Sequence, residues 1–131
     1  MEFTIQIKTS TRDQCIDITR KVKEFIWETG FDSGLCFVYV PHTTSGVTVN
    51  ENADPSVRED LITVLRRLVP LNDPDYEHVE GNTAAHVKSV LVGSSVTVPV
   101  INKKLMLGTW QGILFCEFDG PRSRTVQVYL K

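Results

Sequence analysis

The C-terminal part of the chain, residues 95–131, reads SVTVPVINKKLMLGTWQGILFCEFDGPRSRTVQVYLK, and it decides the class of fold. Apolar runs at residues 96–101, 105–107, 113–118 and 125–130 predict four strands, which turn-forming residues separate. Such short connections favour antiparallel pairing, because parallel strands need crossovers of about a dozen residues or more. This part of the chain therefore predicts a largely antiparallel sheet.

The first half of the chain mixes strands with a helix. Residues 3–7 alternate between apolar and polar side chains, which predicts a half-buried strand, and residues 15–18 form a second short strand candidate. We expect Thr19 to cap a helix that Gly30 ends, with Val22, Phe25 and Ile26 on its apolar face. Residues 35–40 form a continuous apolar run and predict a buried strand, and residues 47–49 resume extended structure.

Two more helices follow. Asp54 and Pro55 are typical of an N-cap and a first helical residue, and apolar residues at helical spacing continue to Leu68, before Pro70. A polar loop then covers residues 71–82, and a third helix is expected at residues 83–92, closed by Gly93. Together these elements predict one compact α+β domain over residues 1–131, a largely antiparallel sheet or sandwich with about three helices.

The composition limits the classes of function. A chain of 131 residues that is 41% hydrophobic and 23% charged is typical of one globular domain. The formal charge of -2 argues against a nucleic-acid partner, and no apolar run approaches the roughly 18 residues of a membrane span. The N-terminus does not resemble a signal peptide, so we expect a cytoplasmic protein without a membrane partner.

The three cysteines, Cys15, Cys36 and Cys116, form no Cys-x-x-Cys motif. Each lies in or beside an apolar stretch, so we expect free, buried thiols. Their neighbours in the sequence supply no electropositive setting for a reactive thiolate.

The three histidines are the first candidates for chemistry. His42 follows a predicted strand, His78 lies in the polar loop and His86 lies in the first turn of the third helix. Three neutral imidazoles can hold Zn²⁺ and leave one position open for water or substrate. Their spacings of 36 and 8 residues match no local metal motif, so only the fold can assemble such a site. Ordinary surface histidines are the alternative interpretation.

Acidic and basic residues offer two further roles. Glu51, next to Asn50, is a candidate base or metal-orienting carboxylate, whereas helix capping alone accounts for Asp54. Arg58 in the first helical turn can bind an anion, or instead pair with a neighbouring acid. Hydroxyls at residues 43–45, Lys88 and the Arg122/Arg124 pair can add to such a site. No phosphate-binding glycine loop and no nucleophile elbow around Ser45 is present.

The string Gly108-Thr109-Trp110-Gln111-Gly112 is unusual for a strand-rich region. Glycines in such a context suggest a bulge or a close backbone approach. Trp110 is then either a core or subunit-interface residue, or an aromatic wall for a planar ligand that Gln111 hydrogen-bonds.

Six strings follow one another in order along essentially the whole chain: PHTTSG (residues 41–46), NENADPSVR (50–58), YEH (76–78), AHVKS (85–89), GTWQG (108–112) and EFDGPR (117–122). Taken together, they resemble the YjbQ family, which is often described as secondary thiamine-phosphate synthase.

The resemblance implies a compact α+β domain that forms a homotrimer and binds a divalent metal, zinc, through His42, His78 and His86. Magnesium is the alternative metal, brought with a substrate diphosphate. It further implies a substrate pocket whose members are Asn50, Glu51, Arg58, Lys88, Trp110 and Gln111. Among these, Glu51 and Arg58 are expected to take part in catalysis. Thr43, which offers a hydroxyl in its loop, is expected to bind substrate as well.

The implied activity joins a pyrimidine diphosphate to a thiazole phosphate. Diphosphate departure usually favours Mg²⁺ with oxygen ligands, so a three-imidazole site makes the synthase reaction an expected secondary activity. The leading hypothesis is a metal-assisted enzyme acting on a small phosphorylated heterocycle. A non-catalytic, trimeric metal- or ligand-binding protein is the alternative, and an interaction protein that uses residues 108–112 as an interface is the third.

Two positions depart from the family pattern. Ala84 stands where the family often has an acid, which removes a possible metal-orienting carboxylate. Lys103 stands where a glycine is common, which is expected to change the geometry of one turn.

Overall fold

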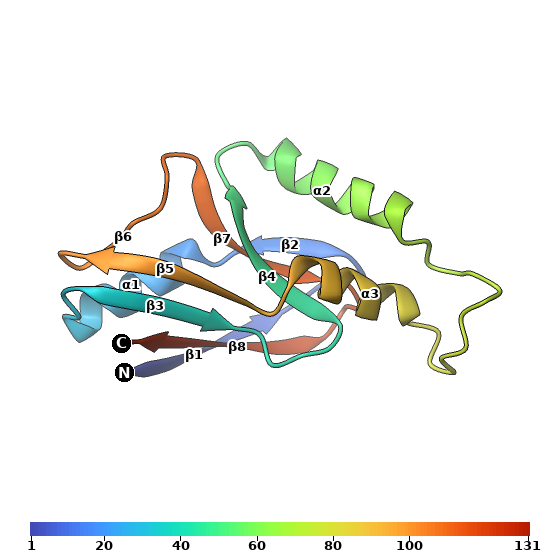
Figure 1. The fold of residues 1–131 in the computed structure, drawn as a ribbon, viewed down its shortest axis with the longest axis horizontal. Helices are drawn as coiled ribbons and strands as arrows, with labels where there is room; N and C mark the ends of the chain where they lie inside the picture. The colour runs from blue at the N-terminus through green and yellow to red at the C-terminus, as the bar shows by residue number, and fades with distance from the viewer.

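The computed structural model describes residues 1–131 and arranges eight strands in two antiparallel sheets (Figure 1). The larger sheet has the order β1 (Glu2–Lys8), β8 (Ser123–Leu130), β3 (Gly34–Tyr39), β5 (Ser95–Ile101) and β6 (Lys104–Leu105). The smaller sheet has the order β2 (Gln14–Asp17), β7 (Gln111–Glu117) and β4 (Ser45–Glu51). The predicted α+β class and antiparallel pairing are confirmed.

The helices are α1 (Thr19–Thr29), α2 (Pro55–Leu68) and α3 (Thr83–Val92). The predicted start of α2 is confirmed, since the Asp54 carboxylate accepts a hydrogen bond of 2.9 Å from the Ser56 amide. The prediction that Thr19 caps α1 is wrong, because Ile18 is the N-cap. The Thr19 hydroxyl instead accepts a hydrogen bond of 2.8 Å from the amide of Ile113 and so ties α1 to β7.

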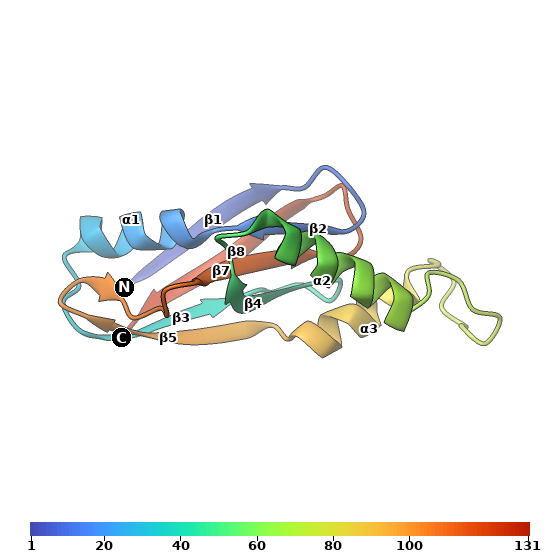
Figure 2. The same cartoon turned by 90° about the horizontal axis from the view of Figure 1, so that it is seen from above.

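The two sheets enclose the main core. Buried residues of the larger sheet, such as Val38 and Val128, pack against Phe115 of the smaller sheet and Ile26 of α1. The other face of the smaller sheet carries Cys116 and the β7-flanking Phe118, which α2 and α3 cover in a second, smaller cluster. The molecule is therefore a sandwich with two helices over the outer side of the small sheet (Figure 2).

The strand β3 corrects one expectation about burial. Its residues alternate, so that Cys36 and Val38 are buried while Leu35, Phe37 and Tyr39 are exposed. The Phe37 ring lies 6.4 Å from the ring of Tyr39 and 6.4 Å from that of Tyr129 on β8, measured between centroids. We call Leu35, Phe37, Tyr39 and Tyr129 the outer aromatic face.

A glycine lets α3 approach β4 closely. A Cβ atom on Gly46 would lie only 2.5 Å from the carbonyl oxygen of Gly93, at the end of α3. The amide of Val47 donates a hydrogen bond of 3.0 Å to that same oxygen. This contact docks the C-terminal end of α3 on β4, next to the segment that carries His42.

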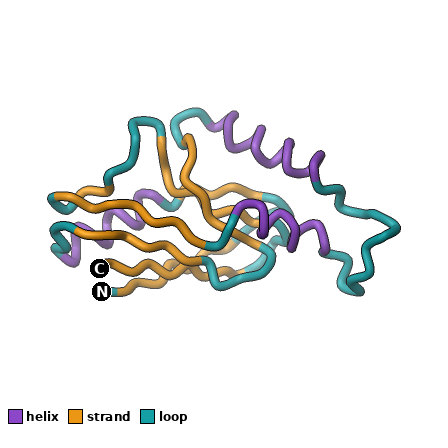
Figure 3. The backbone as a smooth tube through the Cα atoms, in the orientation of Figure 1, coloured by secondary structure: helices purple, strands orange, loops and turns teal.

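The loop between α2 and α3 projects from one end of the molecule, and both termini lie at the opposite end (Figures 1 and 3). No helix has both the length and the apolar character needed to cross a membrane.

Candidate functional site

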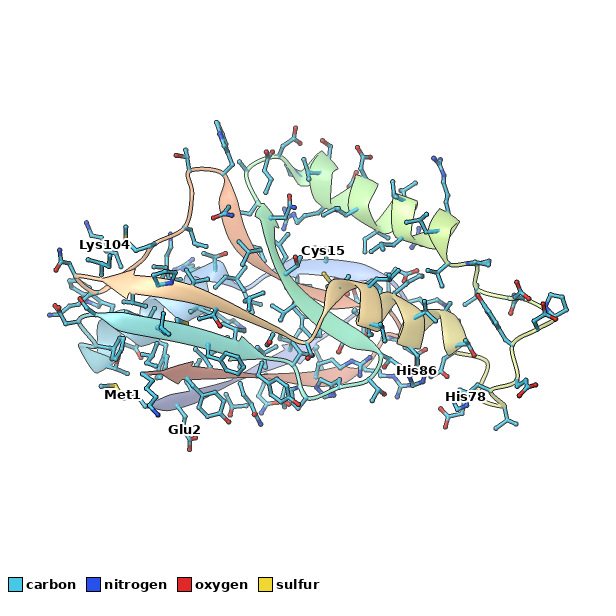
Figure 4. The ribbon with its side chains drawn as sticks, viewed as in Figure 1. Met1, Glu2, Cys15, His78, His86 and Lys104 are labelled. Atoms are coloured by element: carbon cyan, nitrogen blue, oxygen red, sulfur yellow. The ribbon has the colours of Figure 1, made fainter.

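Three separate segments bring the three histidines to one pocket of about 450 Å³. His42 comes from the β3–β4 connection, His78 from the projecting loop and His86 from α3, and Figure 4 labels the last two at the same end of the molecule. The pocket has no hydrophobic lining residue. We call it the histidine pocket; its lining residues are Pro41, His42, Thr43, Thr44, His78, Glu80, Asn82, His86, Asp119, Arg122 and Arg124.

Arg124, which lines the histidine pocket, belongs to a buried ion pair. Arg124 donates to the carboxylate of Glu117 from Nε, at 2.9 Å, and from Nη2, and Glu117 is fully buried. The same Nη2 donates to the hydroxyl of Thr44 at 2.8 Å. Burial raises the pKa of Glu117, but hydrogen bonds from Arg124, the Asp119 amide and Thr9 outweigh it and leave the pKa lowered. The pair therefore stays charged and fixes the loop beside His42.

His42 is held in one orientation. The amide of Thr125 donates a hydrogen bond of 3.0 Å to its Nε2, which leaves Nδ1 without a hydrogen-bond partner in the protein. Partial burial and the nearby charge of Arg124 lower the pKa of His42, and the carbonyl of Thr125, 3.2 Å from the same Nε2, and the charge of Glu117 oppose them only in part. His42 is thus a neutral imidazole at neutral pH, the form that binds metals.

His78 and His86 lie edge to face, with ring centroids 5.4 Å apart. Nε2 of His78 is 3.9 Å from a carboxylate oxygen of Glu80, which is largely exposed. Ala84, named above as a departure from the expected family pattern, is buried at the start of α3.

The remaining acid of the pocket, Asp119, is already engaged. Its Oδ2 accepts hydrogen bonds from Asn82 at 2.9 Å and from Arg122 at 2.8 Å. Burial raises the pKa of Asp119, but these two partners and the charge of Arg12 outweigh it, so the pKa is lowered. The Asn82 contact fixes the start of α3 and with it His86, and Oδ1 of Asn82 is buried with no hydrogen-bond partner in the protein.

The chemistry of the pocket fits a divalent metal. Imidazole nitrogens from three segments are the donor set that Zn²⁺ prefers. As the side chains are placed, no three His, Cys, Asp or Glu residues converge closely enough to hold one ion. His42, His78 and His86 would hold the metal, and Asn82, whose Oδ1 has no hydrogen-bond partner in the protein, lines the same pocket.

Four other predicted site residues gather at the opposite end of β4, and we call them the far cluster: Asn50, Glu51, Trp110 and Gln111. Ser45 at one end of β4 pairs with Glu117, whereas Glu51 at the other end pairs with Gln111. At about 3.3 Å per residue, the strand separates the far cluster from the histidine pocket by about 20 Å.

The GTWQG string forms a tight turn in the far cluster. The amide of Gly108 donates to Oε1 of Gln111 at 2.8 Å, and Trp110 is 63% exposed. A Cβ atom on Gly112 would overlap the side chain of Asn52, so the predicted close approach at this glycine is present. Trp110 therefore lies on the surface and not in the core of the single chain.

Arg58 and Lys88 lie outside both groups. Arg58 lines a separate pocket between α2 and β2 and forms no ion pair with Asp54 or Glu59. Lys88 is buried on α3, where its ammonium group donates to Asp13 at 3.1 Å. Of the predicted site residues, the structure brings together His42, Thr43, His78 and His86.

Sequence reasoning missed Asn82, Glu117 and Asp119 as neighbours of the histidines, whereas Glu80 flanks His78 in the sequence and was expected near it. The sequence did contain a signal for Glu117 and Asp119, because both lie in the EFDGPR string at residues 117–122, which carries part of the family resemblance. The pairing of Asn82 with Asp119 joins residues 37 apart and follows only from the fold.

Comparisons with known proteins agree with one another. The family model described as "UPF0047 protein YjbQ-like" matches residues 3–131. The chain is 55% identical over 125 residues to the UPF0047 protein YugU of Bacillus subtilis, covering 95% of both proteins. It is 51% identical over 128 residues to a UPF0047 protein of Methanocaldococcus jannaschii, covering 98% of this chain and 92% of that protein.

Solved structures show the same fold. An uncharacterised YjbQ/UPF0047 protein of Clostridium acetobutylicum superposes with a TM-score of 0.95 at 50% identity, covering 98% of this chain and 99% of that one. A hypothetical protein of Aeropyrum pernix superposes with a TM-score of 0.95 at 42% identity, covering 100% of this chain and 98% of that one.

Proposed function

The chain belongs to the YjbQ-like UPF0047 family, and from this premise we propose that it is a metal-assisted enzyme acting on a small phosphorylated heterocycle. One observation carries the proposal: three histidines from distant segments line one pocket that has no apolar wall. A pocket of this character suits a small charged group, not an apolar ligand.

Each pocket residue has a role in this proposal. His42, His78 and His86 hold the divalent metal, zinc in the first instance, which when bound stabilises negative charge on phosphate oxygens. Arg122, whose side chain is half exposed, adds positive charge at the rim, and Thr43 offers a hydroxyl donor. Arg124 is committed to Glu117, so it positions the pocket and does not bind substrate.

We propose that the far cluster binds the heterocycle and that a homotrimer brings it to the histidine pocket of another subunit. Two observations support this: the distance of about 20 Å along β4 within one chain, and the exposed outer aromatic face, which is typical of a surface buried between subunits. In this arrangement Trp110 stacks on the ring, Gln111 and Asn50 hydrogen-bond it, and Glu51 acts as base.

The assembly has a direct test. Sedimentation equilibrium is expected to give a trimer, and Phe37→Lys on the outer aromatic face is expected to weaken it. Coexpressed His86→Ala and Trp110→Ala chains are expected to regain activity in mixed trimers, because one intact site then forms between subunits. A monomer, or the absence of any complementation, contradicts the shared site.

The metal is tested on untagged protein. Elemental analysis is expected to find close to one divalent metal per chain, and His86→Ala or His78→Ala is expected to lose it while the melting temperature of the metal-free protein stays unchanged. Glu24→Gln, an exposed change on α1, is the control that keeps the metal. Well-folded wild-type protein that takes up neither zinc nor magnesium contradicts the proposal.

The secondary activity is tested by incubation with the pyrimidine diphosphate and the thiazole phosphate. We expect slow formation of thiamine phosphate and diphosphate that requires the three histidines. Arg58→Gln tests whether Arg58 binds the anionic group of the substrate. Because Arg58 lies away from the histidine pocket, the variant loses activity only if Arg58 has that role.

A non-catalytic metal- or ligand-binding protein is the second candidate, and one observation favours it. Asp119 is engaged by Asn82 and Arg122, Glu117 by Arg124, and only the exposed Glu80 remains as a free carboxylate at the histidine pocket. Tight metal or ligand binding without turnover of any phosphorylated substrate would support this candidate over the enzyme.

A further inference from the structure

Two free thiols lie directly opposite each other in the smaller sheet. Cys15 on β2 pairs with Cys116 on β7. Further along the same ladder, the amide of Ile18 donates to the carbonyl of Ile113 at 2.9 Å, which makes Ile18–Ile113 a hydrogen-bonded pair. Hydrogen-bonded and non-hydrogen-bonded pairs alternate along an antiparallel ladder, so Cys15–Cys116, three positions away, is a non-hydrogen-bonded pair. In such a pair the Cα atoms lie about 4.5 Å apart and the side chains are closer than in a hydrogen-bonded pair. That separation falls within the range of about 4.4–6.8 Å for a disulfide.

The two thiols differ in access. Cys116 is only 5% exposed and belongs to the small cluster under α2 and α3. Cys15 is half-buried and lines a pocket of about 450 Å³ between β2 and α2, together with Arg58 and Arg66. Figure 4 shows Cys15 well away from the end that carries His78 and His86. A reagent in this pocket therefore meets Cys15 and not Cys116.

The fold also gives Cys15 two neighbours that the local sequence lacks, the Cys116 thiol and the guanidinium of Arg58. A hydrogen bond with Cys116 lowers the pKa of Cys15 most; burial opposes it, the charge of Arg58 lowers the pKa further, and Asp17 raises it. The net result is a lowered pKa. By contrast, burial alone raises the pKa of the third thiol, Cys36, to about 11. Arg58 is thus a cationic neighbour of Cys15 that comes from the fold and not from the adjacent sequence.

We propose that Cys15 is a modification site that reacts with hydroperoxides, and that Cys116 resolves the product as an intrachain cross-strand disulfide. In the first step the Cys15 thiolate attacks the outer peroxide oxygen, so an S–O bond forms, the O–O bond breaks, and the alkoxide or hydroxide released takes up a proton. Cys15 loses two electrons to the peroxide and becomes a sulfenic acid. In the second step the Cys116 sulfur attacks Cys15, the S–S bond forms, and the sulfenic oxygen leaves as water with the Cys116 proton.

Hydrogen peroxide added to the full-length protein is the test, read by intact mass and by peptide mapping. Wild-type protein is expected to lose 2 Da through a Cys15–Cys116 disulfide, the mass of the two hydrogens removed. The Cys116→Ser variant is expected to stop at a sulfenic acid on Cys15 that dimedone labels. Cys15→Ser is expected to lose both products, and Cys36→Ser is the matched control that still forms the disulfide.

Reactivity gives a second measurement that needs no variant. In native protein, iodoacetamide is expected to alkylate Cys15 at least about tenfold faster than Cys36 or Cys116, because thiolate content and access govern the rate. If Cys116→Ser does not fold, a dimedone pulse during oxidation of the wild type replaces it and is expected to label Cys15. Equal alkylation rates, a disulfide through Cys36, or peroxide-treated protein that keeps three free thiols overturns the proposal.

Discussion

Arg124 holds Glu117 through two donor atoms, and both side chains are buried directly under the loop that carries His42. The residue after Arg124 donates its amide to His42, so one stretch of β8 fixes both the ion pair and the imidazole. The pair therefore contributes to the stability of the fold and to the geometry of the histidine pocket at once.

Glu117→Gln is expected to lower the free energy of unfolding by about 3–5 kcal/mol, because it leaves the buried guanidinium of Arg124 without a charge partner. Urea unfolding at pH 7 measures the loss. The control is Glu24→Gln, which breaks the exposed Arg20–Glu24 pair and is expected to cost less than about 0.5 kcal/mol. Similar losses of unfolding free energy in Glu117→Gln and Glu24→Gln would show that burial does not strengthen the contribution of the Arg124–Glu117 pair to stability.

Gly46→Ala tests the docking of α3 on β4. The new methyl group would meet the carbonyl of Gly93 at 2.5 Å, so α3 must move away. We expect a loss of about 1–3 kcal/mol, typical of overpacking, and weaker metal uptake because His86 moves with the helix. Gly81→Ala in the projecting loop is the comparison, since its Cβ meets no atom within 4 Å and only its φ of +71° opposes the change. Unchanged metal uptake in Gly46→Ala would separate His86 from the site.

Local signals were sufficient for most of the fold. The Asp54-Pro55 start of α2 and the Gly30 end of α1 lie where the sequence predicts them, because caps depend on adjacent residues. Thr19 failed as a cap because its hydroxyl bonds Asp17 and Ile113 instead, and Ile113 is distant in the chain. The buried interpretation of β3 failed because a run of apolar residues cannot show that one of its faces lacks a covering layer.

The site was harder to predict, since its members meet only in three dimensions. The histidines and the family resemblance pointed to the histidine pocket, and the three side chains line that one pocket in the structure. The same resemblance grouped Lys88 and the far cluster with them, although β4 separates the far cluster and Asp13 binds Lys88. The order of residues in the sequence does not give the distances between their side chains in the folded protein.

Lys103→Gly is expected to stabilise the protein. Asn102 and Lys103 have φ angles of 51° and 65°, the left-handed region that a two-residue hairpin of this type requires and that glycine adopts without strain. Relief of about 1 kcal/mol of strain exceeds the loss of about 0.5 kcal/mol from the contact of Lys103 with Trp27. The melting temperature is expected to rise slightly, whereas Lys104→Gly in β6 is expected to lower it. A lower melting temperature for Lys103→Gly would mean that the cation–π contact dominates.

Acid is expected to remove the contribution of Asp119. Because the folded-state pKa of this carboxyl is lowered, the unfolded chain binds its proton first as the pH falls. The stabilisation is thus complete above the unfolded pKa of about 3.9 and disappears as the pH falls through the lower folded value. Asp119→Asn is expected to be less stable than wild type at pH 7, and the difference should shrink below about pH 4. Urea titrations at pH 7, 5 and 3 test this, and a constant difference would contradict the assignment.

Variants of Lys88 and Asp13 distinguish a structural role of Lys88 from a role in substrate binding. Both side chains are 4% exposed, and Asp13 also accepts a hydrogen bond of 2.9 Å from Arg66. Asp13→Asn leaves the buried ammonium group of Lys88 without a charge and is expected to cost about 3–5 kcal/mol. Lys88→Met leaves Asp13 paired with Arg66 and is expected to cost only about 1.5–3 kcal/mol, the loss of one charged hydrogen bond.

The more exposed Arg66 completes the series, since Arg66→Ala is expected to cost less than about 1 kcal/mol. Unfolding in urea measures the stability lost in each of the three variants. Calorimetric titration with a pyrimidine diphosphate measures whether the variants still bind substrate. Because Lys88 is buried against Asp13 and does not line the histidine pocket, Lys88→Met is expected to bind this ligand as wild type does. Lost affinity in a variant of near wild-type stability would instead place the ammonium group of Lys88 on the substrate.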